Sequence, residues 1–452
     1  MRRSLSLLVL LLASSLYAFG AGRALLLISI DGMRPDSLLQ ADAHGLKIPH
    51  LRHILSEGAH ASGVRGVLPT VTYPSHTTIV TGVWPARHGI VSNQTFDPLG
   101  RNLEGWYWYS EDIAVPTVWE AADRAGLTVG SVSWPVSVGA KGIRYNVPEY
   151  WRTQTTADDL KLLRVLSTPG LLADIVKDVG PYNLNLDDAI PGDRARTRCA
   201  VWILQHGKPQ FMTVHLAALD HLQHVTGPFS PESDAALEQI DEMLGQLEDA
   251  MRAAHPEFAI FVVSDHGFSG IDHTLNLMRP FAEQGLVTLA KNPGFRGAPQ
   301  VVEWKAIAKP DGGSAAIVLK DPKDEATRAK VGNLLRSLAA DPSNGIAAIL
   351  DRPAIAALGG NPDAAFWVDM RPNFSVANSL GEQVTATKGG THGYSPAHAE
   401  MLASFFIAGP DIRQGLSLDE IDMRAIAPTV AAYLGFPFPS ADLKPLPVTA
   451  IY

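Results

Sequence analysis

Six side chains of the kinds that bind divalent metals stand in four short segments of the chain. Three are carboxylates and three are imidazoles, which is enough to give two metal ions three protein ligands each. A mixed set of oxygen and nitrogen ligands suits zinc, with manganese and cobalt as competitors. The six residues are Asp31, Asp220, His224, Asp265, His266 and His392.

A hydroxyl group that can act as a nucleophile stands in a fifth segment, LPTVTYPSHTTIVTG, at Thr72. Pro74 suits the first turn of a helix, and the pattern predicts a helix over roughly 75–81. A hydroxyl just before that turn faces free backbone N–H groups and the positive end of the helix dipole, and a metal contact would lower its pKa further. Thr70 and Ser75 are rival nucleophiles, and a simple N-cap is the structural alternative for Thr72. Two metals beside a nucleophile indicate transfer of a phosphoryl-type group.

The spacing of the candidate ligands is informative only when they are taken together. Asp220 and His224 are four residues apart, so a helical turn would place both on one face. Asp265 and His266 are adjacent, and they can share a region only where a strand ends in an irregular turn, which Gly267 permits. Each pattern alone is weak, and a lone loop histidine such as His392 is more often structural than a ligand. Six such residues are hard to explain as core packing.

Apolar runs of strand length precede most of these segments. They are RALLLISI before Asp31, QFMTVHLA before Asp220, FAIFVVS before Asp265, MLASFFIAG at 401–409 and LTVGSVSW at 127–134. Helical patterns at 232–254 and 423–434 lie between or after them. This alternation predicts an α/β fold, a doubly wound and mostly parallel sheet with helices on both faces. Because ligands bind outside the carboxyl ends of such strands, we expect the candidate residues to converge at one rim.

The chain divides into a core and an insertion on this pattern. Residues 22–269 and 391–452 are expected to form the catalytic core, and residues 270–390 a smaller α+β insertion beside the rim. Residues 1–21 read as an export signal, because Arg2 and Arg3 precede a short apolar run and small residues. That run is shorter than the ~20 residues of a membrane span, although an uncleaved anchor is the alternative. No other segment looks transmembrane.

Composition narrows the class of protein and its compartment. The formal charge is −9, from 37 basic and 46 acidic residues, and no polybasic run marks a nucleic-acid groove. Two divalent ions would still keep the pocket positive for an anionic substrate. Cys199 is the single cysteine, so no intramolecular disulfide can form, and a small buried side chain is its expected role. An exported protein without disulfides indicates a bacterial periplasm or secretion from a bacterium.

The ordered set of motifs resembles the nucleotide pyrophosphatase/phosphodiesterase family of the alkaline phosphatase superfamily. The motifs run from SIDGMRPD through PTVTYPSHTTIVTG, LDHLQHVTGP and VVSDHGF to THGYSP and IAPTVAAYLGFP. The resemblance implies an alkaline-phosphatase-like fold. It also implies that Thr72 is the nucleophile and a metal ligand, and that Asn93 hydrogen-bonds a phosphoryl oxygen. By the same resemblance, one metal takes Asp31, Asp265 and His266, and the other takes Asp220, His224 and His392.

Departures from the family pattern concern the substrate more than catalysis. Tyr73 and Ser75 stand where the family often has Phe and Asn, and Gln223 precedes His224 where Gly is frequent. Tyr73 and Tyr145 are the expected substrate contacts, as surfaces for a nucleobase. Tyr150 and Trp151 are further candidates for stacking on a nucleobase, and packing under a loop is the alternative for both. Lys141 and Arg144 lie in the same loop and are candidates for binding a terminal phosphate, and the alternative is that both charges are solvated.

These observations lead to a ranked set of functions. The first is an exported two-metal phosphodiesterase or nucleotide pyrophosphatase that forms a phosphothreonyl intermediate on Thr72 and acts on a small phosphodiester or nucleotide. A phosphomonoesterase or phosphonate hydrolase with the same machinery is the close alternative, and a non-catalytic binding protein is the distant one. A sulfatase is disfavoured because no C-x-P-x-R motif surrounds Cys199. We expect diesters to be preferred, since Asn93 is neutral where a monoesterase gains from fixed positive charge.

Overall fold

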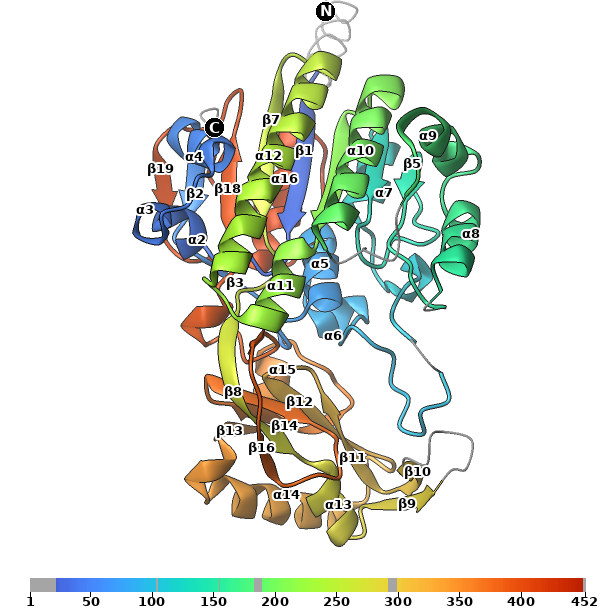
Figure 1. Cartoon of the computed structure of the whole chain (residues 1–452), viewed down its shortest axis with the longest axis vertical. Helices are drawn as coiled ribbons and strands as arrows, with labels where there is room; N and C mark the ends of the chain where they lie inside the picture. The colour runs from blue at the N-terminus through green and yellow to red at the C-terminus, as the bar shows by residue number, and fades with distance from the viewer. Residues whose placement is uncertain (1–21, 103–104, 154, 183–188, 292–298, 450–452) are drawn as a thin grey trace, which may run out of the picture.

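A central eight-stranded sheet organises the upper lobe of the computed structural model, which describes residues 22–102, 105–153, 155–182, 189–291 and 299–449 (Figure 1). Its strands are ordered β19-β2-β18-β7-β1-β6-β4-β5. The parallel centre consists of β7 (Phe258–Val263), β1 (Ala24–Ile30), β6 (Phe211–Leu216), β4 (Val129–Val132) and β5 (Tyr145–Val147). The outer strands are β18 (Phe405–Ala408), antiparallel to β7, then β2 (Ala59–Ala61) and β19 (Leu416–Leu418).

Both faces of this sheet are buried, as a continuous apolar strand requires. In β1, Leu26 and Ile28 belong to one apolar cluster, whereas Leu25 and Leu27 belong to the other. One face packs against α4 (Pro49–Glu57), α10 (Ile190–Gly207) and α12 (Pro231–Ala254). The other packs against α5 (Thr72–Thr81), α7 (Val118–Arg124) and α16 (Ile426–Leu434). The predicted doubly wound α/β fold is therefore confirmed.

A lower lobe contains a separate four-stranded antiparallel sheet (Figure 1). Its order is β11 (Ala306–Pro310), β12 (Ser314–Leu319), β14 (Ala364–Met370) and β13 (Ile346–Asp351), and it has its own apolar cluster. The long strand β8 (Ser269–Asn276) leads into this lobe and pairs with β15 (Asn373–Ala377), β16 (Val384–Ala386) and β17 (Gly390–Thr391). Its helices are α13 (Met278–Glu283), α14 (Glu325–Ala339) and α15 (Arg352–Ala357), and β9 (Val287–Lys291) pairs with β10 (Pro299–Trp304). The expected insertion at 270–390 coincides with these elements, and its independence as a folding unit stays a prediction.

Shorter elements complete the described chain. They are α2 (Asp36–Leu39), α3 (Ala41–His44), β3 (Val64–Arg65), α6 (Pro85–His88), α8 (Thr156–Leu166), α9 (Leu171–Val179), α11 (Ala218–Thr226) and β20 (Ile421–Asp422). None of the helices described is long and apolar enough to cross a bilayer. The expected export signal at 1–21 lies outside the described residues.

Two expected boundaries are wrong. Helix α5 begins at Thr72 rather than near residue 75, so Pro74 occupies its third position, where a missing N–H costs nothing because no earlier carbonyl would accept it. The strand in the 401–409 run is confined to Phe405–Ala408, because Met401 ends a 3-10 turn and Ala403 forms an isolated bridge with Val64 instead of joining the sheet.

The buried sheet predicts a large difference between two valine-to-alanine substitutions. Val262 in β7 is fully buried, whereas Val165 in α8 is 79% exposed. Val262→Ala should lower the free energy of unfolding by about 2 kcal/mol, from two lost methyl groups and the cavity they leave. Val165→Ala should change it by less than about 0.5 kcal/mol. Urea unfolding of both variants checks this, and equal losses would contradict the assignment of β7 to the core.

Candidate metal centre

The candidate ligands converge at the carboxyl ends of three neighbouring strands. Asp31 directly follows β1, and Asp265 and His266 follow β7 by one residue. Helix α11 follows β6 and carries Asp220 and His224 on one face, as their spacing predicts. His392 comes directly after β17, where the chain returns from the lower lobe. Because β6, β1 and β7 are adjacent and parallel, their ends place these residues at one rim.

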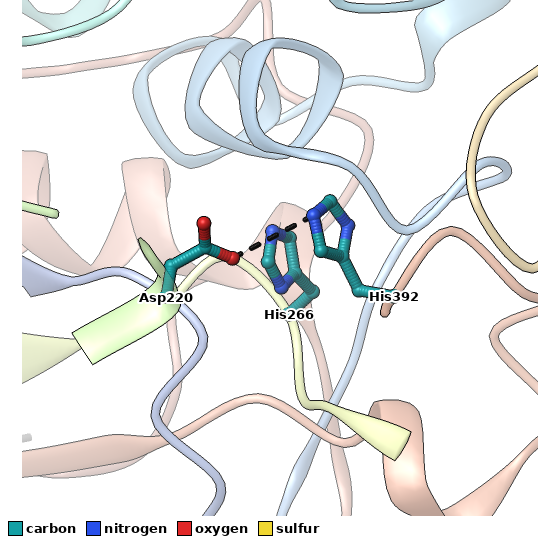
Figure 2. Close-up of side chains that lie close together, drawn as sticks. All are labelled: Asp220, His266 and His392. Carbon is teal, nitrogen blue, oxygen red and sulfur yellow. Dashed lines mark ion pairs between the residues drawn. The ribbon is translucent and has the colours of Figure 1, made fainter. Parts of the chain in front are cut away.

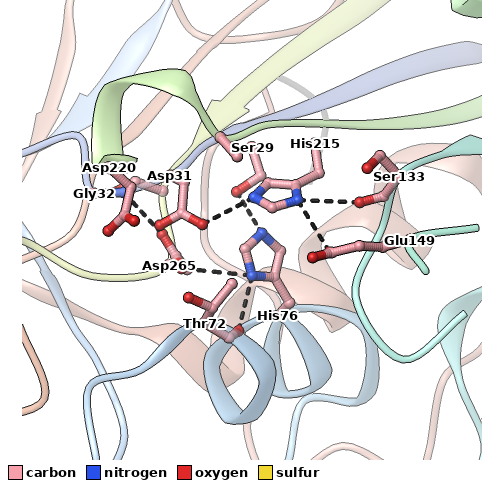
Figure 3. Close-up of polar contacts among 12 residues, drawn as sticks. Ser29, Asp31, Gly32, Thr72, His76, Ser133, Glu149, His215, Asp220 and Asp265 are labelled. Atoms are coloured by element: carbon pink, nitrogen blue, oxygen red, sulfur yellow. Dashed lines mark hydrogen bonds and ion pairs between the residues drawn. The ribbon is translucent and has the colours of Figure 1, made fainter. Parts of the chain in front are cut away.

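One compact group consists of Asp31, Asp265 and His266, whose ligand atoms all lie within 4.8 Å of one another. The Nε2 atom of His266 lies 3.0 Å from Asp265 Oδ2 and 3.4 Å from Asp31 Oδ1. Thr72, the first residue of α5, brings its Oγ1 to 3.5 Å from the same Nε2 atom. Figure 3 shows Thr72, Asp31 and Asp265 around this space. The hydroxyl predicted as nucleophile therefore lies beside a group that can hold a metal.

A second compact group consists of Asp220, His266 and His392 (Figure 2). His392 Nε2 lies 3.6 Å from Asp220 Oδ1, and the His392 ring stacks on His266 with centroids 3.7 Å apart. His224 was expected here, and its Nε2 lies 3.4 Å from Asp220 Oδ2 although its side chain is 40% exposed. Among the described residues His266 thus stands in both groups, and His224 stands at the edge of the second.

All three imidazoles are oriented in the same way. The Nδ1 atoms of His224, His266 and His392 each lie 3.0 Å from a backbone carbonyl oxygen, those of Gly390, Gly267 and Thr70 respectively. A carbonyl only accepts, so each Nδ1 carries the hydrogen and each Nε2 faces the carboxylates. This tautomer is the one that metal-binding histidines adopt when a backbone carbonyl holds the other nitrogen.

One oxygen of each of the three carboxylates accepts no hydrogen bond in the described structure. Asp31 Oδ1, Asp220 Oδ1 and Asp265 Oδ2 are buried and accept no hydrogen bond, although each lies within ion-pair distance of a histidine. Burial, together with repulsion from Asp265 and Asp220, raises the pKa of Asp31 well above its usual value. Burial opposes a charge on His266, but the carboxylates of Asp265, Asp31 and Asp220 outweigh it and raise its pKa to about 9. These residues fit divalent cations, which would satisfy the three oxygens and replace the proton on His266.

The hydroxyl groups near the site have distinct environments. Thr72 is the first helical residue and Val71 is the N-cap, so the alternative of Thr72 as an N-cap is wrong. Thr70 donates its hydroxyl to Tyr394 O and accepts the Gly393 N–H, so its oxygen is used in holding the loop of His392. Asn93 accepts the Tyr73 N–H at 2.9 Å, which ties it to the first turn of α5.

A cavity of about 230 Å³ opens onto both groups. Of the residues expected to take part, Asp31, Thr72, Tyr73, Asn93, Asp220, His224 and His392 line it. The Tyr73 ring is buried and packs edge-on against Trp106 and Trp108. Tyr145 is not among the lining residues, because it starts the parallel strand β5 and so lies at the end of the sheet away from the site. Its predicted contact with substrate is not supported by this position.

Trp151, for which the sequence left stacking and packing open, lines the cavity. Further lining residues were not expected from the sequence. They are Trp106, Glu149, His215, Ala217 and His221. His215, on β6, lies between Asp31 and Glu149, with Nε2 3.0 Å from Asp31 Oδ2 and Nδ1 3.6 Å from Glu149 Oε2 (Figure 3). Burial opposes a charge on His215, but these two carboxylates raise its pKa well above the usual value. A histidine inside an otherwise apolar strand was the available signal.

Behind this layer, His76 ties α5 to the sheet. Its Nδ1 lies 2.8 Å from Thr72 O and its Nε2 lies 2.8 Å from Ser29 Oγ. Burial and the neighbouring His215 lower its pKa to about 3, so the ring is neutral. The contact fixes the start of α5, and with it the position of the Thr72 hydroxyl, relative to β1.

Comparison with known proteins yields a family match over most of the chain. The family model of type I phosphodiesterase/nucleotide pyrophosphatase matches residues 25–395. Human ectonucleotide pyrophosphatase/phosphodiesterase family member 1 is 27% identical over 254 residues, which are 54% of this chain and 23% of that protein. A venom phosphodiesterase of Crotalus durissus collilineatus is 25% identical over 403 residues, 86% of this chain and 42% of the venom protein. The chain thus spans less than half the length of these two relatives.

Solved structures resemble the whole described fold. Human ectonucleotide pyrophosphatase/phosphodiesterase 5 superposes with a TM-score of 0.65 at 21% identity, covering 93% of this chain and 96% of that one. An inactive variant of the murine protein, in complex with AMP, superposes with a TM-score of 0.63 at 20% identity, covering 92% and 96%. The alkaline-phosphatase-like fold expected from the motifs is confirmed by these matches.

The buried carboxylate oxygens predict that metal stabilises the folded chain. Ligands placed by folding bind metal only in the native state, so metal at 100 times its Kd adds about 2.7 kcal/mol to stability. We expect a chelator to lower Tm and zinc to restore it. Asp265→Asn, which keeps the shape but removes one charge, should respond much less. A wild-type Tm unaffected by chelator and by zinc would contradict the metal centre.

Proposed function

The chain belongs to the type I phosphodiesterase/nucleotide pyrophosphatase family, and from that premise we propose that it hydrolyses small phosphodiesters or nucleotide pyrophosphates with Thr72 as nucleophile. The observation that carries the proposal is the position of the Thr72 hydroxyl. Its Oγ1 lies on the cavity, 3.5 Å from the Nε2 atom of His266, which both ligand groups share.

The proposed metal ligands are the two triads that the motifs imply. Asp31, Asp265 and His266, with Thr72, would hold one divalent ion, and Asp220, His224 and His392 would hold the other. Zinc is the proposed metal because the ligands are carboxylate and imidazole. When bound, the ions supply positive charge that lowers the pKa of a hydroxyl and stabilises charge on phosphoryl oxygens.

In the proposed reaction, Thr72 Oγ1 forms a bond to phosphorus as the bond from phosphorus to the leaving oxygen breaks. The result is a phosphothreonyl intermediate, from which water releases the product and restores the hydroxyl. The first turn of α5 favours this step, since backbone N–H groups there face a developing anion. Asn93 uses Oδ1 to accept the Tyr73 N–H, so its amide N–H₂ is the group left to donate to a phosphoryl oxygen.

The cavity wall supports a small aromatic substrate such as a nucleotide. Tyr73, Trp106 and Trp151 line it, and their rings form one cluster, with Trp106 and Trp151 centroids 4.8 Å apart. The murine relative in complex with AMP, and the names of the curated relatives, support the same substrate class. The close alternative remains a phosphomonoesterase or phosphonate hydrolase.

Export to the periplasm or outside the cell is part of the proposal. Its support is the expected signal at 1–21 and the names of the relatives, which describe ectoenzymes and a venom protein.

Thr72→Ala should abolish turnover of bis-p-nitrophenyl phosphate, because Thr72 is the one Ser or Thr among the residues lining the described cavity. Ser75→Ala is the matched control. The Ser75 hydroxyl is buried one turn along α5 and has no hydrogen bond, so its loss should leave kcat within about twofold.

Retention of near wild-type turnover in Thr72→Ala would overturn the assignment, and loss in Ser75→Ala alone would transfer it to Ser75. No turnover by the zinc-loaded wild type would favour the non-catalytic alternative.

The lack of basic side chains on the cavity wall bears on the choice between diester and monoester substrates. No Lys or Arg is among the residues that line the described cavity, and a monoester dianion gains more from such a residue than a diester does. A missing charged hydrogen bond is worth roughly 1.5–3 kcal/mol. We therefore expect kcat/KM for a diester to exceed that for the matched monoester by about tenfold or more.

Arg144→Ala is the control for this ratio. The Arg144 guanidinium lies over the Tyr145 ring, 5.7 Å from its centroid, so its removal should leave the ratio unchanged. A monoester preference that collapses in Arg144→Ala would promote the monoesterase alternative.

A further inference from the structure

We propose that His215 is a positioning residue for the metal on the Thr72 side, because it holds one oxygen of Asp31 and leaves the other for the ion. The proposal rests on the proposed metal centre and concerns a residue that none of the motifs includes. Its consequence is that metal affinity at this side, and not at the Asp220 side, depends on His215.

The two oxygens of Asp31 have different surroundings. Asp31 Oδ2 lies 3.0 Å from His215 Nε2, whereas Oδ1 is buried, accepts no hydrogen bond and lies 3.4 Å from His266 Nε2 (Figure 3). A carboxylate held at one oxygen can turn only about that contact. The contact therefore directs Oδ1 toward the space that Asp265 and His266 share.

His215 is itself held firmly enough to act as an anchor. In the register of β1 and β6, His215 pairs with Ser29, which lies two residues before Asp31. Its Nδ1 donates to Ser133 O at 3.0 Å and lies 3.6 Å from Glu149 Oε2, and the ring packs against His76 with centroids 4.5 Å apart. The side chain is 1% exposed, so one rotamer is enforced.

Glu149 extends the arrangement to the cavity wall. Its Oε1 accepts a hydrogen bond from Trp151 Nε1 at 3.4 Å, while Oε2 faces His215. Trp151, Glu149, His215 and Asp31 therefore form a continuous polar chain from the aromatic wall to the metal ligand. Partners of this kind fix a ligand's orientation, and their loss typically lowers metal affinity or activity by 10–100-fold.

The neighbouring ligand has a different kind of support, which makes the effect specific. Asp265 Oδ1 accepts the backbone N–H of Gly32 at 3.1 Å, and its other oxygen faces the shared space. Asp220 directs its oxygens to His224 and His392 and has no contact of this kind with His215. His215 also packs against His76, which lies 3.6 Å from Asp265 Oδ2. A substitution that keeps this packing should therefore reach the metal through Asp31.

Zinc binding at the two sites can be measured separately if a ligand of one site is first substituted. A His392→Ala background weakens the Asp220 side, and an Asp265→Asn background weakens the Thr72 side. In each, zinc affinity is measured by competition with a fluorescent chelator for His215, His215→Phe and His215→Gln. Phe keeps the ring volume without the hydrogen bonds, whereas the amide of Gln can replace the donor to Asp31.

In the His392→Ala background we expect His215→Phe to weaken zinc binding about 10–100-fold, and Gln to recover most of the loss. In the Asp265→Asn background both substitutions should change it by less than about threefold. Unchanged affinity in the first background, equal loss in both, or no recovery by Gln would overturn the proposal. If His215→Phe does not fold in the metal-free state, His215→Asn takes its place. Its shorter amide can replace Nδ1 toward Ser133 O but not Nε2 toward Asp31, so the same outcomes decide.

Failure of the proposed function would look different. Zinc that binds with this dependence on His215 while Thr72→Ala keeps its turnover would sustain the positioning role and remove the nucleophile assignment. Absence of zinc binding in the wild type would remove both.

Discussion

Three carboxylate oxygens, each buried and without a hydrogen bond, share one small region, and their mutual repulsion shapes the site. Asp31, Asp220 and Asp265 each present an oxygen without a hydrogen bond to a small region that also contains the Nε2 atoms of His266 and His392. Buried carboxylates are costly unless positive charge compensates them, and among the described residues His266, whose pKa the carboxylates raise to about 9, supplies part of that charge. The sheet holds them together regardless, because they are anchored to the ends of strands whose faces are fully packed.

The fold supplies this anchorage from elements far apart in the chain. Asp31 and Asp265 follow the ends of β1 and β7, Asp220 lies in α11 just after β6, and Thr72 begins α5. Loop contacts add the last ligand, since Thr70 holds His392 through its carbonyl and Gly393 through its hydroxyl. The lower lobe takes part through β17 and through Gly313, whose N–H donates to His392 O at 2.7 Å. The proposed metal ions would therefore also stabilise the contacts among segments that are far apart in the chain.

Much of the site could be predicted because its residues follow apolar strands. Asp31 and Asp265 stand where buried runs end, and Asp220 and His224 have helical spacing, so the expected convergence is observed. The supporting residues could not be found this way. His215 lies within a buried strand, where a histidine usually indicates a satisfied core residue, and its contacts with Asp31 and Glu149 depend on register across β6 and β1. The position of Tyr145, at the first residue of β5 and not among the residues lining the cavity, could not be predicted from its nearness in sequence to the strand at 129–132.

In the proposed site, the six ligands hold two separate metal ions beside Thr72. Crystals grown with zinc and measured at the zinc absorption edge test it most directly, because anomalous peaks locate each ion independently of the protein. We expect two peaks. One should be contacted by Asp31, Asp265, His266 and the Thr72 hydroxyl, and the other by Asp220, His224 and His392. A single peak shared by His266 and both groups, or no peak at the rim, would contradict it.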